Sequence, residues 1–149
     1  MLPLYFLSSS IEYSADHATG AVKIAPANGT HERYLLQNVL SYISSELHAS
    51  VAPLFYPTLS NEVAEHYRHK AATKLQYIND KLVGTKKFVV GKHFTVADAY
   101  LYIVLSWSDY LKVDLAPFPQ VRAYFEHIHG MDEVQAAHAR MATGPSTTV

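Results

Sequence analysis

An apolar run that follows a helix-start signal lies in the second half of this sequence. Thr95 and Asp98 have the spacing of a capping box, in which each residue satisfies a backbone N–H near the other. A carboxylate at this position also suits the positive end of a helix. Few charges occur before Asp109, and the apolar residues that follow the box are Ala99, Leu101, Ile103, Val104, Leu105 and Trp107. The pattern predicts a helix from about Val96 to Lys112 that is buried on nearly all sides, and it assigns Thr95 and Asp98 to folding, not to catalysis.

Two long segments before this run have helical periodicity. One extends from Thr30 to about Ala52, where Pro53 follows. Its apolar face carries Leu35, Val39, Ile43 and Leu47, and Leu36 and Leu40 widen it. The other begins at a cap, Ser60 or Asn61, and ends at Gly84. Its face carries Val63, Tyr67, Ala71, Leu75, Ile78 and Leu82.

Two shorter helices are expected after the central run. The first starts near Pro117 and Pro119 and ends at Gly130, a candidate C′ residue. The second extends from Met131 to about Met141. Since none of these segments alternates as a strand does, the fold class expected is all-α, a bundle of about five helices.

The first 28 residues differ from the rest. They contain a short apolar start, a helical turn around Ile11–His17 and a Gly- and Pro-containing stretch, so residues 1–28 are interpreted as lead-in and linker. Residues 29–149 are interpreted as the helical domain, with a frayed tail from Thr143 to Val149.

Composition excludes several classes of function. The chain has 149 residues, 49% of them hydrophobic, which suits one compact domain. Twelve basic and thirteen acidic residues give a formal charge of −1, so no nucleic acid is expected as a partner. The absence of cysteine rules out disulfides, thiolate metal sites and a cysteine nucleophile in this chain. No stretch has the length of a membrane span and the apolar start lacks the features of a signal peptide, so a soluble, cytoplasmic protein is expected.

Nine histidines raise the question of a metal site. His66 and His69 have i, i+3 spacing, but zinc requires three or four ligands and spacing supplies no third. A solvated helix face is therefore preferred, and no metal is expected. His127 and His129 are interpreted as surface residues near a helix C-terminus, where a positive charge is favoured.

Other polar and aromatic groups leave alternatives open. Glu46 and His48 lie among serines, but a catalytic triad is defined by geometry, so none is inferred from neighbourhood. Trp107 and Tyr110 can line a cavity or fill the core, and core filling is favoured. No glycine-rich phosphate loop supports nucleotide chemistry.

Four runs of residues, in order along the chain, carry a family resemblance. They are Ala25–Thr30 with Glu32–Tyr34, Ser45–His48 with Pro53–Phe55, Phe94–Tyr100, and Leu105–Ser108 with Asp114–Leu115. Over residues 25–142 the sequence resembles the all-helical C-terminal domain of the glutathione S-transferases, most closely the bacterial beta class.

The resemblance implies both an activity and a site. The family activity is conjugation of glutathione, as cosubstrate, to hydrophobic electrophiles in detoxification. His48 matches a histidine that borders the glutathione and electrophile sites, and Trp107 matches a wall of the electrophile pocket. Ser41, where the beta class often has asparagine, and Tyr110 are further pocket candidates. Ala49 stands where a glutathione-holding lysine usually follows the histidine.

The resemblance also implies a dimer and a second domain. The first two long helices usually form much of a homodimer interface. A complete transferase begins with a thioredoxin-like domain that carries the thiol-activating Ser, Tyr or Cys, and residues 1–24 do not match it apart from Tyr13–Asp16, a remnant of its last helix. No catalytic residue is therefore assigned. Apolar surface left by the missing domain is expected to favour an oligomer.

Three hypotheses follow. The chain is a transferase homologue whose other half is supplied by a different chain or by a noncanonical arrangement, or it is a non-catalytic helical module that binds small hydrophobic molecules or assembles with partners. The third is a glutathione-independent isomerase or lyase that uses His48 and Trp107.

Overall fold

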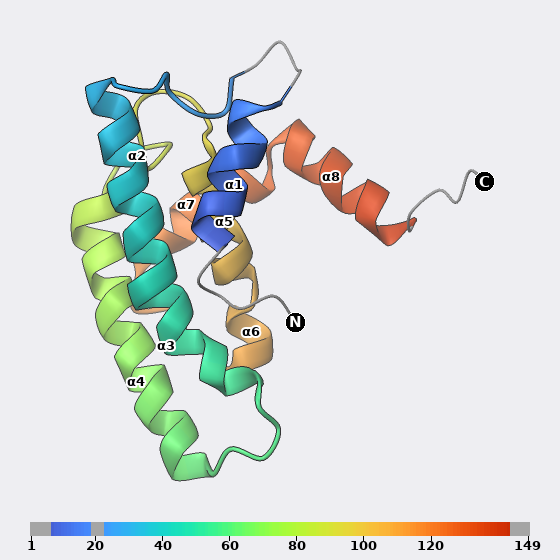
Figure 1. Ribbon diagram of the computed structural model, residues 1–149. Coiled ribbons are helices and arrows are strands. Elements are labelled where there is room, and N and C mark those ends of the chain that lie inside the picture. Colours follow the sequence, from blue (N-terminus) through green and yellow to red (C-terminus); the bar gives the residue numbers. More distant parts are fainter. Residues whose placement is uncertain (1–6, 19–22, 144–149) are drawn as a thin grey trace.

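Helices account for all the regular structure that the computed structural model describes, which covers residues 7–18 and 23–143 (Figure 1). In chain order they are α1 (Leu7–Asp16), α2 (His31–Tyr42), α3 (Ala49–Val51), α4 (Asn61–Tyr77), α5 (Val96–Ser106), α6 (Ser108–Leu111), α7 (Pro119–His129) and α8 (Asp132–Ala142). Those residues contain no strand, so the all-α expectation is confirmed. None of the described helices is long and apolar enough to cross a membrane.

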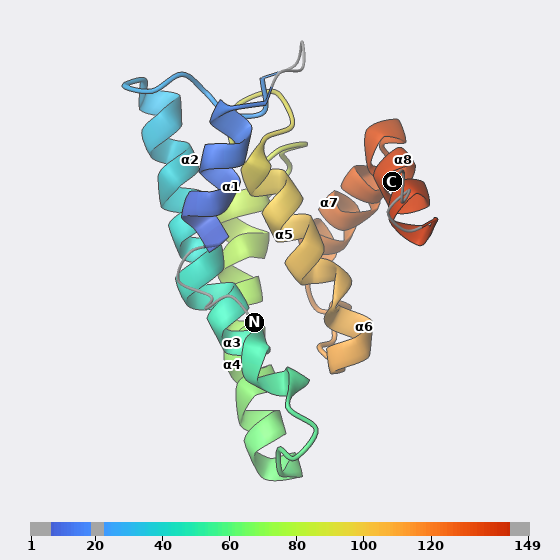
Figure 2. The ribbon, with the colours of Figure 1, turned by 45° about the vertical axis from the view of Figure 1, so that its right-hand side comes forward.

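Two long helical rods lie side by side (Figures 1 and 2). In the first, α2 continues through a π-helical segment, Ile43–His48, into α3 and a 3₁₀ turn, Ala52–Phe55. In the second, α4 continues into another π-helical segment, Ile78–Val83, and ends at Gly84, whose φ of 52° a glycine tolerates. The α-helical part of the first rod ends at Val51, next to the expected Ala52. Pro53 then occupies an early position of the 3₁₀ turn, where its missing N–H costs nothing.

The expected caps of both rods are formed, but their apolar faces differ from the prediction. Thr30 and Ser60 accept from the backbone N–H groups three residues on. On α2, however, Leu35 is 45% exposed whereas Leu36 is fully buried. On α4 it is Ala64, not Val63, that faces the core. The i+4 spacing could not distinguish adjacent apolar residues, and the wider π turns change the register along each rod.

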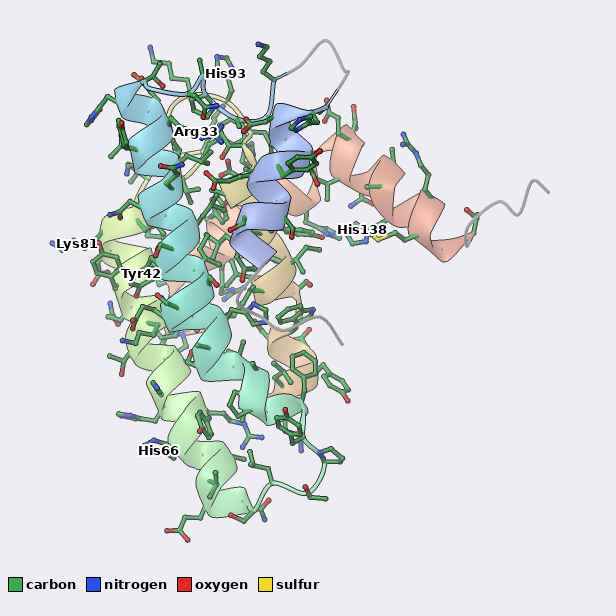
Figure 3. The ribbon with its side chains drawn as sticks, viewed as in Figure 1. Arg33, Tyr42, His66, Lys81, His93 and His138 are labelled. Carbon is green, nitrogen blue, oxygen red and sulfur yellow. The ribbon has the colours of Figure 1, made fainter. Side chains whose placement is uncertain are left out.

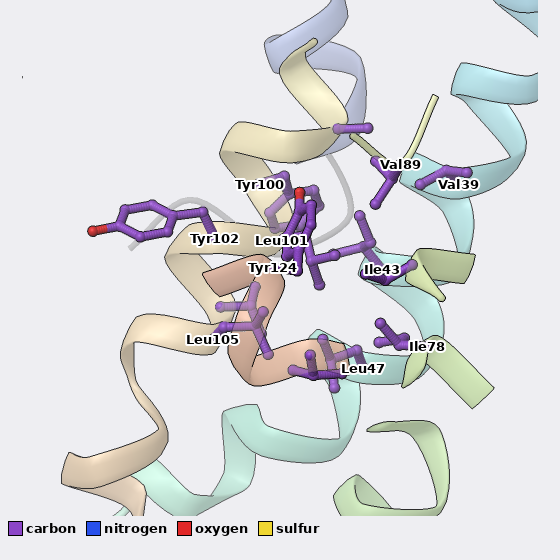
Figure 4. Close-up of a cluster of buried hydrophobic side chains, with 14 of the residues drawn as sticks. Val39, Ile43, Leu47, Ile78, Val89, Tyr100, Leu101, Tyr102, Leu105 and Tyr124 are labelled. Atoms are coloured by element: carbon purple, nitrogen blue, oxygen red, sulfur yellow. The ribbon is translucent and has the colours of Figure 1, made fainter. Parts of the chain in front are cut away.

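Helix α5 is the centre of the core. Leu101 and Leu105 meet side chains from both rods, including Ile43, Leu47 and Ile78 (Figure 4). The expected burial on nearly all sides is found, and the exposed residues of α5 are Ile103 and Ser106. The expected single helix to Lys112 is wrong, because α5 ends at Ser106 and α6 starts after a turn at Trp107.

The capping box at the start of α5 is formed and extended. The fully buried Asp98 carboxylate accepts from the Thr95 backbone N–H at 2.8 Å and from the Thr95 hydroxyl at 2.9 Å. It also accepts from the Val89 N–H and the Tyr124 hydroxyl, both at 2.8 Å. Burial raises the pKa of Asp98, while the four donors oppose that rise. The box therefore joins the loop before α5 and helix α7 to the N-terminus of α5.

Helix α1 is longer than the helical turn expected around Ile11–His17. The guanidinium of Arg33, which is buried on α2, donates to both carboxylate oxygens of Asp16 at 2.8 Å, and Glu12 lies 3.5 Å away. Ala15 packs into the main core. The domain division at residue 28 stays a prediction. The expectations for Met1–Phe6 and for Gly144–Val149 lie outside the described residues.

Helix α8 projects from the bundle and buries none of its residues (Figures 1 and 2). Gly130, between α7 and α8, has a right-handed φ of −75°, so it ends α7 without the left-handed C′ conformation typical of glycine. Helix α8 then begins two residues after Gly130, at Asp132.

Candidate functional site

His48 is held inside the bundle by a tyrosine of the central helix. It lies at the end of the π-helical segment Ile43–His48, is 6% exposed, and its Nδ1 is 2.7 Å from the hydroxyl of Tyr100 on α5. Burial lowers the pKa of His48 and raises that of Tyr100. A neutral imidazole therefore faces a protonated phenol, and the bond fixes the ring orientation.

Four aromatic rings extend from His48 toward solvent. The Trp107 ring lies 5.1 Å from that of His48, Phe55 lies edge-on 5.2 Å from Trp107, and Tyr110 lies 5.9 Å from Phe55. His48, Trp107, Phe55 and Tyr110 are hereafter called the aromatic row. Phe55 is 41% exposed and Tyr110 is 76% exposed. The row is therefore buried at the end formed by His48 and exposed at the end formed by Phe55 and Tyr110. Such a surface can take a flat hydrophobic molecule with one end near an imidazole.

The structure brings some of the predicted site residues together. His48, Trp107 and Tyr110 belong to one row, but the prediction that Tyr110 fills the core is wrong because its ring faces solvent. Sequence reasoning did not assign Phe55 or Tyr100 to a site. Both lie within runs that carry the family resemblance, and that was the only available signal.

Ser41 and Glu46 take no part in the contacts that form the row. Ser41 is exposed about two helical turns before His48, and its carbonyl accepts from the Ser45 hydroxyl. Glu46 forms an ion pair with Lys74 on α4, which lowers the pKa of the Glu46 carboxyl. The hydroxyl of Ser50 donates to its own helix at Leu47. These partners are incompatible with a triad around His48.

The interior behind the row offers little space. A cavity of about 10 Å³, room for about one water, lies between α3, α4, α5 and α6. Its walls are apolar and include Leu47, Leu75 and Leu105. This cavity is too small for a substrate of organic size, whereas the outer part of the row is exposed.

Comparison with known proteins identifies the family. The family model described as "Glutathione S-transferase, C-terminal domain" matches residues 40–131, more than half of the chain. The chain belongs to the glutathione S-transferase C-terminal domain family. The expected resemblance to bacterial beta-class transferases is confirmed by relatives of known sequence and structure.

Three relatives illustrate the match. Glutathione S-transferase GstA of Escherichia coli O157:H7 is 35% identical over 127 residues, which are 85% of this chain and 62% of GstA. BphK, a bacterial transferase solved as a ternary complex, is 40% identical, with a TM-score of 0.80 over 88% of this chain and 64% of BphK. The beta-class transferase of Sphingomonas chungbukensis is 32% identical, with a TM-score of 0.80 over 92% and 66%. The chain thus spans a little under two thirds of the length of GstA and BphK.

Two positions depart from the residues that the beta-class resemblance leads us to expect. Ser41 and Ala49, where asparagine and lysine are expected, are both exposed and uncharged. A short neutral side chain cannot form the charge-assisted bond to an anion that lysine forms. Neither position therefore supplies a positive charge.

Proposed function

We propose that this chain is the helical part of a cytoplasmic glutathione S-transferase that conjugates glutathione to hydrophobic electrophiles in detoxification. The observation that carries the proposal is the aromatic row, in which Trp107 lies between the buried His48 and the exposed Phe55. In this proposal Phe55, Trp107 and Tyr110 bind the electrophile, and His48 contacts its polar end.

Thiol activation is assigned to a different part of the enzyme. A thiol becomes a nucleophile when a hydrogen-bond donor or a positive dipole at the sulfur lowers its pKa. Of the two phenols at the row, Tyr110 lies at its exposed end, and the Tyr100 hydroxyl is already bonded to His48. We therefore place the activating group on a thioredoxin-like domain outside these 149 residues. A related sphingomonad transferase, 35% identical, was solved with glutathione, which supports glutathione as the cosubstrate.

A non-catalytic binding module is the second candidate. Its support is that the aromatic row is complete within this chain and needs no glutathione to take up a hydrophobic ligand. The two candidates share the ligand surface and differ only in whether glutathione reacts there, so one set of measurements separates them.

The ligand surface is tested by fluorescence. Trp107 is the only tryptophan of the chain, so its emission reports directly on the row. Titration with a hydrophobic naphthalene dye should quench Trp107, and Phe55→Ala should weaken binding about 3- to 10-fold, as expected for loss of one aromatic contact. Tyr56→Ala is the matched control, because Tyr56 is the adjacent exposed aromatic outside the row. Equal losses in both variants, or none in either, would contradict the proposed surface.

Catalysis is tested separately. The chain alone and the chain joined to the N-terminal segment of a beta-class relative should be compared by glutathione calorimetry and by conjugation of a chlorodinitrobenzene electrophile. We expect turnover only in the joined protein, with a lower rate in His48→Ala. Dye binding without glutathione binding in either protein would favour the module. Turnover of a bound small molecule without glutathione, lost in His48→Ala, would favour an isomerase or lyase.

A further inference from the structure

A second cluster of side chains converges where α8 meets the bundle. Tyr102 on α5 points its hydroxyl out of the core (Figure 4). That hydroxyl lies 2.7 Å from Nδ1 of His129, at the end of α7, and 2.8 Å from Nε2 of His138 on α8. His138 reaches from α8 toward the bundle (Figure 3). Side chains from three helices thus bring one phenol oxygen and two imidazole nitrogens close together, and each of these atoms can bind a metal ion.

The protons of this cluster show what holds it together without an ion. A phenol has one proton, so it can donate to only one imidazole and must accept an N–H from the other. The two ring nitrogens that face Tyr102 are also the atoms through which histidine binds metals. Ligand atoms at about 2.0 to 2.1 Å from a tetrahedral ion lie roughly 3.3 Å apart. The two O···N distances of 2.7 and 2.8 Å are therefore about half an ångström shorter than the ligand separations in such a site.

We propose that Tyr102, His129 and His138 form a binding site for a late first-row divalent metal ion, with water completing the coordination. Imidazole and phenol donors suit Cu²⁺ and Zn²⁺, and Cu²⁺ is expected to bind most tightly by the general affinity order. When the ion binds, the Tyr102 phenol coordinates as phenolate and its proton passes to solvent. His129 is exposed and His138 is partly exposed, whereas Tyr102 is buried, so the ion would reach the site from the side of the two histidines.

The tyrosine distinguishes this cluster from the other histidines. His66 and His69 are both exposed on α4. Within the described residues, no three His, Cys, Asp or Glu side chains are grouped to hold an ion. Tyr102 supplies the third ligand that a search confined to those four residue types does not include.

Metal binding at this site is also expected to change how firmly α8 is held against the bundle. Helix α8 buries none of its residues, and besides the cluster it is held by the partly buried Met131 and Val134 and by the Gln135 side chain, which donates to the His129 carbonyl at 2.6 Å. An ion that joins His138 to Tyr102 and His129 replaces two hydrogen bonds by coordination bonds. Metal binding should therefore reduce local opening of α8.

Calorimetric titration of the full chain with Cu²⁺ and with Zn²⁺ tests the site. Glycine in the buffer competes for the ion and so suppresses its weak binding to single histidines. We expect one ion to bind per chain. Its affinity should fall about tenfold or more in Tyr102→Phe and in His138→Gln, relative to the wild type. The double variant His66→Gln/His69→Gln is the matched control and should bind as the wild type does. A phenolate-to-Cu²⁺ charge-transfer band should appear in the wild type and be lost in Tyr102→Phe.

Hydrogen exchange supplies an independent readout. Added metal should slow exchange of the α8 amides in the wild type and in the control variant, but not in His138→Gln. Circular dichroism should show an unchanged bundle in His138→Gln, since α8 contributes nothing buried. The proposal is overturned if Tyr102→Phe and His138→Gln bind the first ion as tightly as the wild type, or if metal leaves α8 exchange unchanged.

Discussion

At the scale of single residues, Asp98 joins three parts of the bundle: the loop before α5, the start of α5 and helix α7. Its carboxylate accepts four hydrogen bonds from Val89, Thr95 and Tyr124, and it is fully buried. Donors left without an acceptor in the interior lose the hydration that they had in the unfolded chain. Removing the carboxylate should therefore cost more than the bonds themselves contribute.

The substitution Asp98→Asn tests this role. One carboxylate oxygen becomes an NH₂ group that faces donors, so we expect the free energy of unfolding to fall by about 3 kcal/mol. Urea denaturation monitored by circular dichroism measures the change. Asp109→Asn, an exposed acid near the start of α6, is the control and should change stability by less than about 0.5 kcal/mol. Similar losses in the two variants would contradict a special role for Asp98.

The spacing of Thr95 and Asp98 predicted the box, because its residues lie within one helical turn. The contacts with Val89 and Tyr124 could not be predicted, because they join residues 9 and 26 positions apart and depend on how the loop and α7 pack. The candidate site shows the same limit. His48 and Trp107 were identified by resemblance, whereas Tyr100 bonds to His48 across 52 positions and had no local signal.

At the scale of elements, α1 shows what periodicity could not detect. The segment contains three consecutive serines and reads as irregular, yet it forms a ten-residue helix. Its attachment comes from another element, through the ion pair between Asp16 and the buried Arg33 of α2. A tertiary contact of this kind leaves no pattern in the sequence.

The docking of α1 should depend on pH. The hydrogen bonds from Arg33 lower the pKa of Asp16 below its ordinary value of 3.8, so the pair stabilises the docked helix above that pH. This stability is lost as the pH falls through the lowered pKa, because the protonated carboxyl cannot pair with Arg33. Amide NMR signals of α1 followed from about pH 6 to about pH 3 should show its release in the acid part of this range.

Asp16→Asn separates this ion pair from general acid effects. The variant should show loosened α1 signals already at neutral pH and little further change on acidification. Asp109→Asn should follow the wild-type curve. An α1 that stays docked in Asp16→Asn would show that apolar contacts such as Ala15 suffice.

At the scale of the whole molecule, the outer faces of the two rods suggest self-association. Tyr34 and Leu35 on α2 and Val63 and Tyr77 on α4 are large apolar side chains exposed to solvent. Members of this family are typically dimeric, and the resemblance places much of the interface on these two helices. Exposed apolar surface of this kind often marks an interface.

We expect light scattering at micromolar concentration to give the mass of a dimer. Leu35→Glu/Tyr77→Glu should shift it toward the 16.6 kDa monomer, because burying two carboxylates in an apolar interface is costly. Met141→Glu is the control, since Met141 is an exposed apolar residue on α8. A monomeric mass for the unmodified chain would contradict the prediction.

The π-helical segment that ends at His48 bears on which changes of chain length the site can accept. A wider turn accommodates one more residue than a regular α-helical turn. If one residue were deleted within Ile43–His48, the turn could close into regular α-helix, and Leu47 and His48 would keep their orientation toward the core. A deletion in the regular helix of α2 would instead turn His48 by about 100° around the helix axis relative to the residues before the deletion. Related sequences that are one residue shorter are therefore expected to direct the same histidine to Tyr100 only where the length change falls in this segment.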